Sequence, residues 1–243
     1  MLNSVKRNLI FLSAIIAAAT GCGPKQMRPS SSLDTPENHY RNGMRRFEDS
    51  DLRSAQYEFD RARALNPDFS GSFVGSALVA AKQGNFFLAR KQLEEAIHKN
   101  NGFSDSFVAK GRMITMEGVS RGNETDHWLE DAQRAFRKAS RLAPEDDYVD
   151  YHTGMSYLQA YKFDRALDSF DKIMDRNKGP FMVRALNQIE RIQTIKRASP
   201  GSDYGMKISV NPKITRAELA VLLIEELKLA ELVRQHGPGN TIE

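Results

Sequence analysis

The strongest constraint on the fold is a spaced set of small and apolar residues that returns four times along the chain. In its first copy, Ala55, Phe59, Ala62 and Pro67 stand at offsets of 0, 4, 7 and 12 residues. Offsets of four and seven place side chains on one face of an α-helix, and a proline cannot continue that helix. The other copies follow at steps of 34, 43 and 34 residues: Ala89, Leu93, Ala96 and Asn101; Ala132, Phe136, Ala139 and Pro144; Ala166, Phe170, Ile173 and Lys178. Such a period predicts a stack of similar helical units.

A second helical segment precedes each copy, and it too carries a small residue at a fixed place. These residues are Gly43, Ala77, Gly111 and Gly154. Small side chains let two antiparallel helices pack closely. The arrangement resembles the tetratricopeptide repeat (TPR), which implies an all-α superhelical solenoid of about four helix-turn-helix repeats plus C-terminal helices. The array then covers 36–180, with units at 36–69, 70–103, 104–146 and 147–180.

In the TPR family the first helix of each unit lines the concave side of the solenoid. By this resemblance we expect a groove that binds a protein or peptide partner. Its expected lining is Tyr40, Met44, Phe47, Val74, Leu78, Lys82, Val108, Arg112, Met116, Tyr148, Tyr151, Met155 and Gln159. The set is rich in aromatic residues and methionine and poor in charge, which favours an extended or helical apolar peptide. A helix phase shifted by one residue would instead place part of the set in the core.

The third unit is nine residues longer than the others, and the extra residues lie between Met116 and Trp128. One interpretation is a longer loop between the two helices of the unit. The other is a recognition loop, with His127 and Trp128 as anchors. For Trp128 we favour packing at the start of the second helix.

The N-terminus has the pattern of a secretory signal peptide, here 1–21. Lys6 and Arg7 precede an apolar run from Leu9 to Ala19. Eleven residues at a rise of 1.5 Å span roughly 16 Å, about half of a bilayer core, so this run predicts a signal peptide and not a transmembrane helix.

The signal peptide ends on Ala19-Thr20-Gly21-Cys22, which resembles a bacterial lipoprotein lipobox. The resemblance implies that Cys22 carries acyl chains such as palmitate and becomes the first mature residue. Because Gly23 and not aspartate follows, it also implies sorting to the outer membrane, facing the periplasm. The alternative is an ordinary signal peptide with a chance cysteine. Residues 22–35, rich in serine and proline, predict a flexible tether.

Two C-terminal segments follow the array. The first, 181–200, predicts a capping helix whose apolar face covers the last repeat. The second, 201–243, contains Thr215 and Glu218, which form the pattern of a capping box at the start of an amphipathic helix. Its Ile-Thr-Arg-Ala-Glu stretch also resembles the S-layer homology (SLH) motif, which implies a wall-binding role for Thr215, Arg216 and Glu218. Otherwise this helix packs on the array or on a partner.

Charge and cysteine content exclude other classes of function. With 35 basic and 31 acidic residues the net charge is +4, too small to indicate a nucleic-acid partner. A single cysteine excludes a disulfide framework or a multi-cysteine zinc site, and the five histidines show no metal-ligand spacing. We expect no cofactor and no enzymatic activity. The sequence therefore predicts a lipid-anchored envelope scaffold that binds partner proteins; the alternative is a lipoprotein that anchors the cell wall, with peptidoglycan or its polymer as partner.

Overall fold

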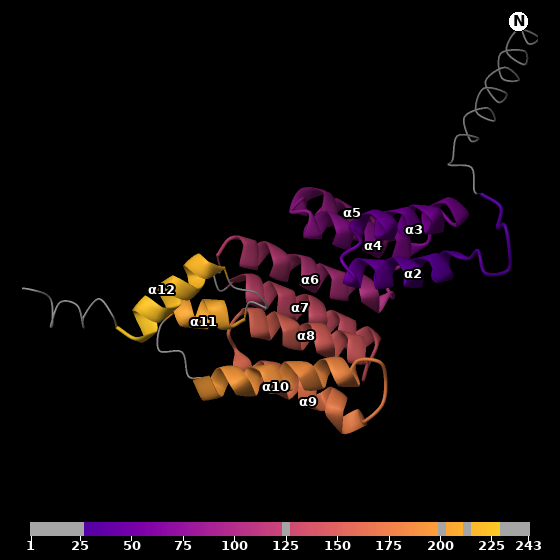
Figure 1. Ribbon diagram of the computed structural model, residues 1–243. Coiled ribbons are helices and arrows are strands. Elements are labelled where there is room, and N and C mark those ends of the chain that lie inside the picture. Colours follow the sequence, from indigo (N-terminus) through magenta and orange to yellow (C-terminus); the bar gives the residue numbers. More distant parts are fainter. Residues whose placement is uncertain (1–26, 123–126, 199–202, 211–214, 229–243) are drawn as a thin grey trace, which may run out of the picture.

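The computed structural model describes residues 27–122, 127–198, 203–210 and 215–228, and no β-strand occurs within these ranges. Helices account for most of them (Figure 1). The helices are α2 (Pro36–Glu48), α3 (Leu52–Leu65), α4 (Ser70–Lys82), α5 (Phe86–Lys99), α6 (Ser104–Ser120), α7 (His127–Leu142), α8 (Asp147–Gln159), α9 (Phe163–Arg176), α10 (Met182–Ala198), α11 (Asp203–Ser209) and α12 (Arg216–Glu226). The prediction of an all-α solenoid is confirmed.

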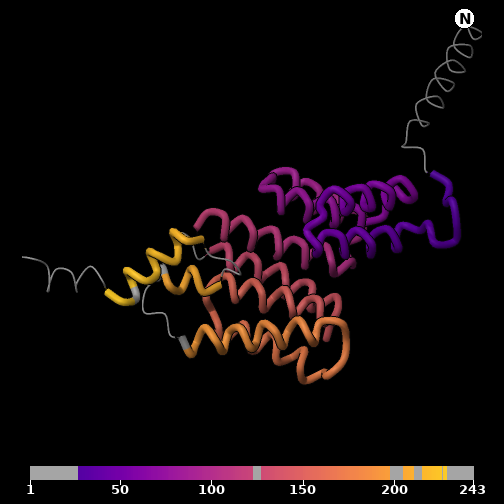
Figure 2. Tube along the Cα trace, in the orientation of Figure 1, coloured from indigo at the N-terminus to yellow at the C-terminus, as the bar shows by residue number. Residues whose placement is uncertain are grey.

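The helices from α2 to α9 form four antiparallel pairs that follow one another through the molecule (Figure 2). Each unit expected from the sequence holds one pair. Successive first helices (α2, α4, α6 and α8) contact one another, whereas in the described parts of the chain successive second helices (α3, α5, α7 and α9) make no comparable contact. The array therefore curves toward its first helices, which form the concave side.

Each tight turn within a unit uses one residue in the left-handed conformation. Ser50, Gly84 and Tyr161 have φ angles of 64°, 79° and 59°. In the first two turns the residue that follows, Asp51 or Asn85, caps the next helix, because its side chain accepts a hydrogen bond from a backbone N–H three residues downstream. The first two units thus repeat the same turn: a residue with positive φ followed by a capping Asp or Asn.

Glycine positions set how closely the paired helices approach. The ring of Phe59 is fully buried between Gly43 of its own unit and Gly75 of the next. A Cβ atom on either glycine would lie less than 3.0 Å from that ring. Phe136 fills the same place beside Gly111, and Phe170 beside Gly154. The second unit has the smaller Leu93 where the others have phenylalanine, and there Ala77 stands in place of glycine.

The extra residues of the third unit lengthen a helix before they form a connection. The first helix of this unit, α6, has 17 residues, against 13 in α2, α4 and α8. The interpretation as a loop therefore fails for 117–120, while 123–126 lie outside the described residues. Trp128 is buried at the start of α7 and packs on Gly118, as the preferred interpretation had it.

The segment before α2 lies on the first repeat and is not a free tether. The N–H of Met27 donates to the carbonyl of Ala64 at 2.8 Å. Asp34 is buried and accepts from the backbone and side chain of Ser30 at 2.6 and 2.9 Å, from Arg61, and from the Nε2 of His39 at 2.8 Å. The hydrogen bonds from Arg61 and Ser30 hold the pKa of this carboxyl well below its usual value. Residues 27–34 thus depart from the expected flexible tether, because one buried carboxylate satisfies donors from three elements.

Asp34→Asn tests this attachment. The change keeps the size of the side chain but removes the charge that Arg61 and His39 face. We expect faster hydrogen exchange at the amides of Met27 and Ser30, because the segment opens locally more often. Asp68→Asn is the control, since Asp68 is exposed and its ion pair with Lys99 is solvated; exchange at Met27 and Ser30 should not change in this variant. Equal exchange in the wild type and Asp34→Asn would show that the carboxylate does not hold the segment.

Beyond the array, α10 packs on α9 and buries Ala185, Ile192 and Ile195. Leu186, which follows the buried Ala185, is 41% exposed and does not contribute to this contact. Val210, just after α11, joins the same cluster.

The capping box of Thr215 and Glu218 is present at the start of α12. α12 lies at the end of the molecule beside α11 (Figure 1). Its apolar side chains are largely open to solvent. The exposed apolar residues are Leu219, Val221, Leu223, Ile224 and Leu227. Within the described residues α12 contacts α11 and makes no comparable contact with the array, so the alternative in which it packs on the array is not seen there. Within those residues, no helix is both long and apolar enough to cross a bilayer.

Candidate functional site: the concave cavity

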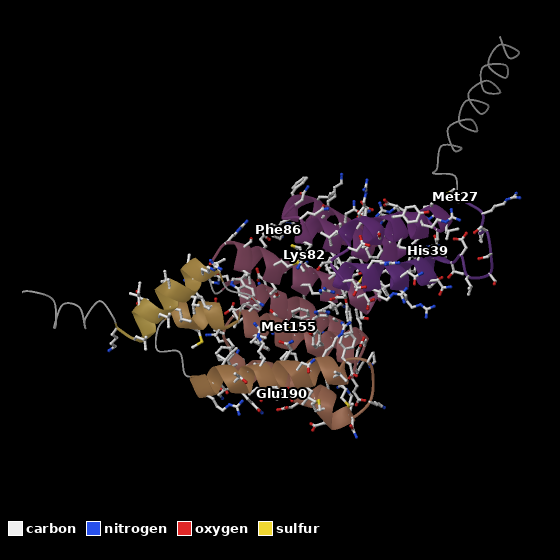
Figure 3. The ribbon with its side chains drawn as sticks, viewed as in Figure 1. Met27, His39, Lys82, Phe86, Met155 and Glu190 are labelled. Carbon is white, nitrogen blue, oxygen red and sulfur yellow. The ribbon has the colours of Figure 1, made fainter. Side chains whose placement is uncertain are left out.

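A cavity of about 590 Å³ opens on the concave side, between the C-terminal halves of the first helices. Its apolar walls come from Ala81, Phe86, Met116, Val119, Tyr151 and Met155, and its polar groups from Glu48, Lys82, Arg112, Thr115, His152, Ser156 and Gln159. All three of Lys82, Phe86 and Met155 line this cavity. In the view of Figure 3, Lys82 and Phe86 lie above α6 and Met155 lies below it. We call this the concave cavity.

Part of the groove expected from the sequence lies in this cavity. Of the thirteen residues, six line it: Lys82, Arg112, Met116, Tyr151, Met155 and Gln159. They come from α4, α6 and α8, mostly from the later turns, so the open part of the groove lies toward the C-terminal ends of these helices.

Three expected groove residues belong to the core. Val74, Leu78 and Val108 are at most 1% exposed, so a partner could not reach them, and the prediction is wrong at these positions. For Val74 and Leu78 the reason is that α4 packs against α2, α3, α5 and α6 together, which leaves almost none of its surface open. Only the C-terminal end of α4, with Ala81 and Lys82, borders the concave cavity. Val108, on α6, is buried in the cluster of Phe136 and Val149.

The expected residues of α2 are also used inside the protein. Tyr40 is buried among Phe59, Phe69 and Phe103 and donates to Asp105 at 2.7 Å. Phe47 is 5% exposed and Met44 packs on the core. Burial, followed by the nearby Asp105, raises the pKa of Tyr40 well above its usual value, so its hydroxyl stays protonated as a donor.

Arg112 forms the floor of the concave cavity. It is 8% exposed and donates to Glu48 at 2.9 Å and to the hydroxyl of Tyr148 at 2.9 Å, while its guanidinium lies 5.2 Å from the ring of Phe47. Burial alone would lower the pKa of Arg112, but Tyr148 and Glu48 outweigh it and the pKa is raised. Burial also raises the pKa of Tyr148 to about 12. Because Glu48 neutralises Arg112, the exposed Lys82 is the cation that this cavity presents to a ligand.

The sequence pattern missed several lining residues. The hydroxyls of Thr115 and Ser156 lie 2.9 Å apart and join α6 to α8. When the Thr115 hydroxyl donates to the carbonyl of Gly111, it accepts from Ser156. Phe86 and Val119 were missed because they come from the start of a second helix and from the lengthened end of α6. The length of the third unit was the one signal that could have drawn attention to Val119.

His152 sits at the edge of the cavity as a neutral ring. It meets Tyr148 and Tyr151 edge to face, with ring centroids 4.7 and 5.3 Å apart. Burial, with smaller contributions from Arg112 and Arg184, lowers the pKa of this imidazole well below its usual value of 6.5. A charged imidazole is therefore incompatible with the packed site.

This burial predicts a loss of stability in mild acid. A histidine with a lower pKa in the folded state binds protons more readily when unfolded, so stability falls as pH drops below about 6.5. We expect the melting temperature of the wild type to fall more between pH 7 and pH 5 than that of His152→Gln. Thermal unfolding followed by circular dichroism measures both slopes. His98→Gln is the control, because His98 is exposed; parallel slopes for all three proteins would contradict the prediction.

In the parts of the chain that the structure describes, no group of three histidine, cysteine, aspartate or glutamate side chains is placed to hold a metal ion. Cys22 lies outside the described residues. The geometry of the concave cavity is that of a binding surface with apolar walls and a neutralised polar floor.

Comparison with known proteins supports the repeat assignment. No family model matches the chain. The mouse tetratricopeptide repeat protein 36 is 29% identical over 118 residues, which are 47% of this chain and 59% of the relative, so less than two thirds of the relative is covered. Among solved structures, the thermophilic TPR protein TTC0263 of Thermus thermophilus has a TM-score of 0.53 at 18% identity, over 79% of this chain and 99% of that one.

Two further solved structures are less similar. Pseudomonas aeruginosa pilF has a TM-score of 0.45 at 16% identity, over 84% of this chain and 93% of that one. Yeast Tom70 has a TM-score of 0.39 at 19% identity, over 74% and 44%. The likeness to TTC0263 concerns the fold alone. Together with the spacing of its small residues and the stacked helix pairs, this likeness shows that the chain folds as an all-α solenoid of the tetratricopeptide-repeat type.

Proposed function

We propose that the chain is a membrane-anchored scaffold of the bacterial envelope that holds an apolar segment of a partner protein in its concave cavity. The observation that carries this proposal is the apolar wall formed by Met116, Tyr151 and Met155 above a floor whose buried charge is already neutralised. A cavity of this size has room for a few side chains and not for a folded domain. Methionine side chains adapt to differently shaped apolar ligands.

The anchoring part of the proposal rests on the N-terminal sequence. A lipobox-like Ala19-Thr20-Gly21-Cys22 would place acyl chains on Cys22. At about 0.8 kcal/mol per buried methylene, two or more chains hold a protein on a membrane. The scaffold would then act at the periplasmic face of the outer membrane, for example while an envelope complex is assembled. Metabolic labelling with a clickable palmitate analogue, compared between the wild type and Cys22→Ser, tests this part by itself.

The binding part is tested by photo-crosslinking in cells. A benzoylphenylalanine replaces Val119, which lines the cavity and is 38% exposed. Adding Met116→Glu and Met155→Glu should reduce crosslinked partner at least about tenfold, because a partner's apolar side chains would then face two carboxylates. The matched control is Val183→Glu with Leu186→Glu, which replaces two exposed apolar residues of α10 that lie outside the cavity.

Circular dichroism of both double variants must show wild-type helix content. Unchanged crosslinking in the Met116→Glu, Met155→Glu variant would contradict the assignment of the cavity. An equal loss in the α10 control would contradict it as well, because the effect would then follow surface charge and not the cavity. Tyr151 is not used, since its ring also packs on Phe170 and Phe181.

The alternative function is attachment to the cell wall through the SLH-like segment. Arg216 favours it, because its side chain is exposed at the first turn of α12, whereas Thr215 and Glu218 are occupied with each other in the capping box. Co-sedimentation with purified sacculi tests this function. Arg216→Ala should abolish pelleting, and Arg197→Ala, an exposed arginine on α10, should leave it unchanged. Equal pelleting of both variants, or none with the wild type, would exclude a wall contact through Arg216.

A further inference from the structure

A second and larger cavity lies on the opposite face of α6. It has a volume of about 730 Å³ and runs between the second helices α5 and α7, with α6 as its floor. We call it the α5–α7 cleft. It shares no lining residue with the concave cavity, because Arg112, Thr115 and Met116 face one side of α6 while Lys110, Ile114 and Glu117 face the other. One helix therefore separates two sites.

The α5–α7 cleft concentrates positive charge. It is lined by five basic side chains, those of Arg90, Lys110, Arg121, Arg134 and Lys138, against two acidic ones, those of Glu117 and Asp131. Its formal charge is thus three units positive, in a chain whose total is +4. Most of the excess charge of the protein is gathered in one place instead of being spread over the surface.

The acidic residues of the cleft neutralise its arginines and not its lysines. Glu117 pairs with Arg90 at 2.9 Å and with Arg121 at 2.7 Å, and Asp131 pairs with Arg134. Among the described residues, no carboxylate lies within ion-pair distance of Lys110 on α6 or Lys138 on α7. The two ammonium groups lining the cleft therefore remain available to an incoming anion.

Beneath these charges the cleft has an apolar floor. Phe107 and Ile114 line it from α6, and Trp128 lines it from α7. The ammonium group of Lys138 lies 5.6 Å from the centroid of the Phe107 ring, which holds it above the floor. Carboxylates at the rim and an apolar side chain at the base are the complementary features of a ligand for such a surface.

We propose that the α5–α7 cleft binds an acidic peptide segment of a second protein partner, with carboxylates on Lys110 and Lys138 and an apolar side chain on Phe107 and Ile114. A peptide fits better than a phosphate-bearing ligand. Phosphate favours the two-pronged guanidinium fork, and the three arginines of the cleft already hold carboxylates. With the concave cavity on the other face of α6, the solenoid would hold two partners at once.

The test is fluorescence anisotropy of a labelled peptide of glutamates with one central leucine, added to the purified chain. Binding should weaken as salt is raised. Lys110→Glu with Lys138→Glu should weaken it by about tenfold or more, since attraction becomes repulsion. The matched control is Arg53→Glu with Lys91→Glu, which changes the net charge equally at exposed positions outside the cleft; its affinity should stay within about twofold of the wild type.

Several outcomes would overturn the proposal. One is equal loss of affinity in the control variant, because binding would then follow net charge alone. Another is equal binding of a peptide with glutamine in place of every glutamate. Phosphatidylglycerol vesicles are the third arm: if they bind in a manner that depends on Lys110 and Lys138 while the peptide does not, the cleft is a lipid site. None of these readouts depends on the concave cavity, whose crosslinking test is independent.

Discussion

Phe59→Ala should lower the free energy of unfolding by about 3–5 kcal/mol, a large fraction of the stability of a domain. The Phe59 ring is fully buried and touches two glycines that belong to different units. Its removal leaves a cavity that the flanking helices cannot fill without moving two units together. Urea denaturation followed by circular dichroism measures the change as a shift of the midpoint at constant slope.

Phe87→Ala is the matched control, because the Phe87 side chain is 81% exposed. Its effect should stay within about 0.5 kcal/mol. A further comparison tests the size match directly: Gly43→Ala should be less harmful in combination with Phe59→Leu, which copies the Ala77 and Leu93 arrangement of the second unit. A Phe59→Ala protein as stable as the Phe87→Ala protein would show that the Gly–Phe contacts do not hold the units together.

Glu48→Ala is expected to cost about 2–3 kcal/mol of stability, because it leaves the buried Arg112 without its carboxylate partner. Glu48 belongs to the first unit and Arg112 to the third, so the 2.9 Å contact joins two parts of the array that are 64 residues apart. This free-energy cost is low for the loss of one partner of a buried ion pair, because Glu48 is 32% exposed. Water can therefore take part of the place of its carboxylate in the variant. Urea denaturation is again the measurement.

The double variant Glu48→Ala, Arg112→Met decides the cause of that loss. If the cost comes from an uncompensated buried charge, removing the charge as well should recover most of the stability of the wild type. Met fits the space of the arginine stem and faces Phe47. Additive losses in the double variant would mean instead that the ion pair itself stabilises the concave floor.

Much of the fold could be predicted because its determinants are local and repeated. The spacing of Ala55, Phe59 and Ala62 marks the buried face of a second helix, and the same face is fully buried in all four units. Phenylalanine in the second helix occurs with glycine in the first, and leucine with alanine. This match in volume is visible in the sequence and is what the packing of each pair depends on.

The site was harder to predict because it depends on how neighbouring units pack. Val74 and Met155 were both expected to line the groove, yet Val74 is fully buried and Met155 lines the cavity. The difference is that α4 has neighbours on every side, whereas α8 borders open space. The spacing of residues within one helix does not indicate how many other helices will pack around it. Likewise, nothing in the spacing shows that Glu48 reaches Arg112 across an entire unit.

The docked segment before α2 limits how the protein could sit on a membrane. If acyl chains are attached at Cys22, only four residues, 23–26, separate that cysteine from Met27, whose backbone N–H donates a hydrogen bond to the carbonyl of Ala64. The five Cα–Cα steps from Cys22 to Met27 span at most roughly 17 Å. The first repeat would then stay close to the bilayer surface, and the short connection would restrict how the solenoid tilts relative to the membrane. A partner protein would then have to approach the membrane closely, as well as match the chemistry of the concave cavity or the α5–α7 cleft, in order to bind.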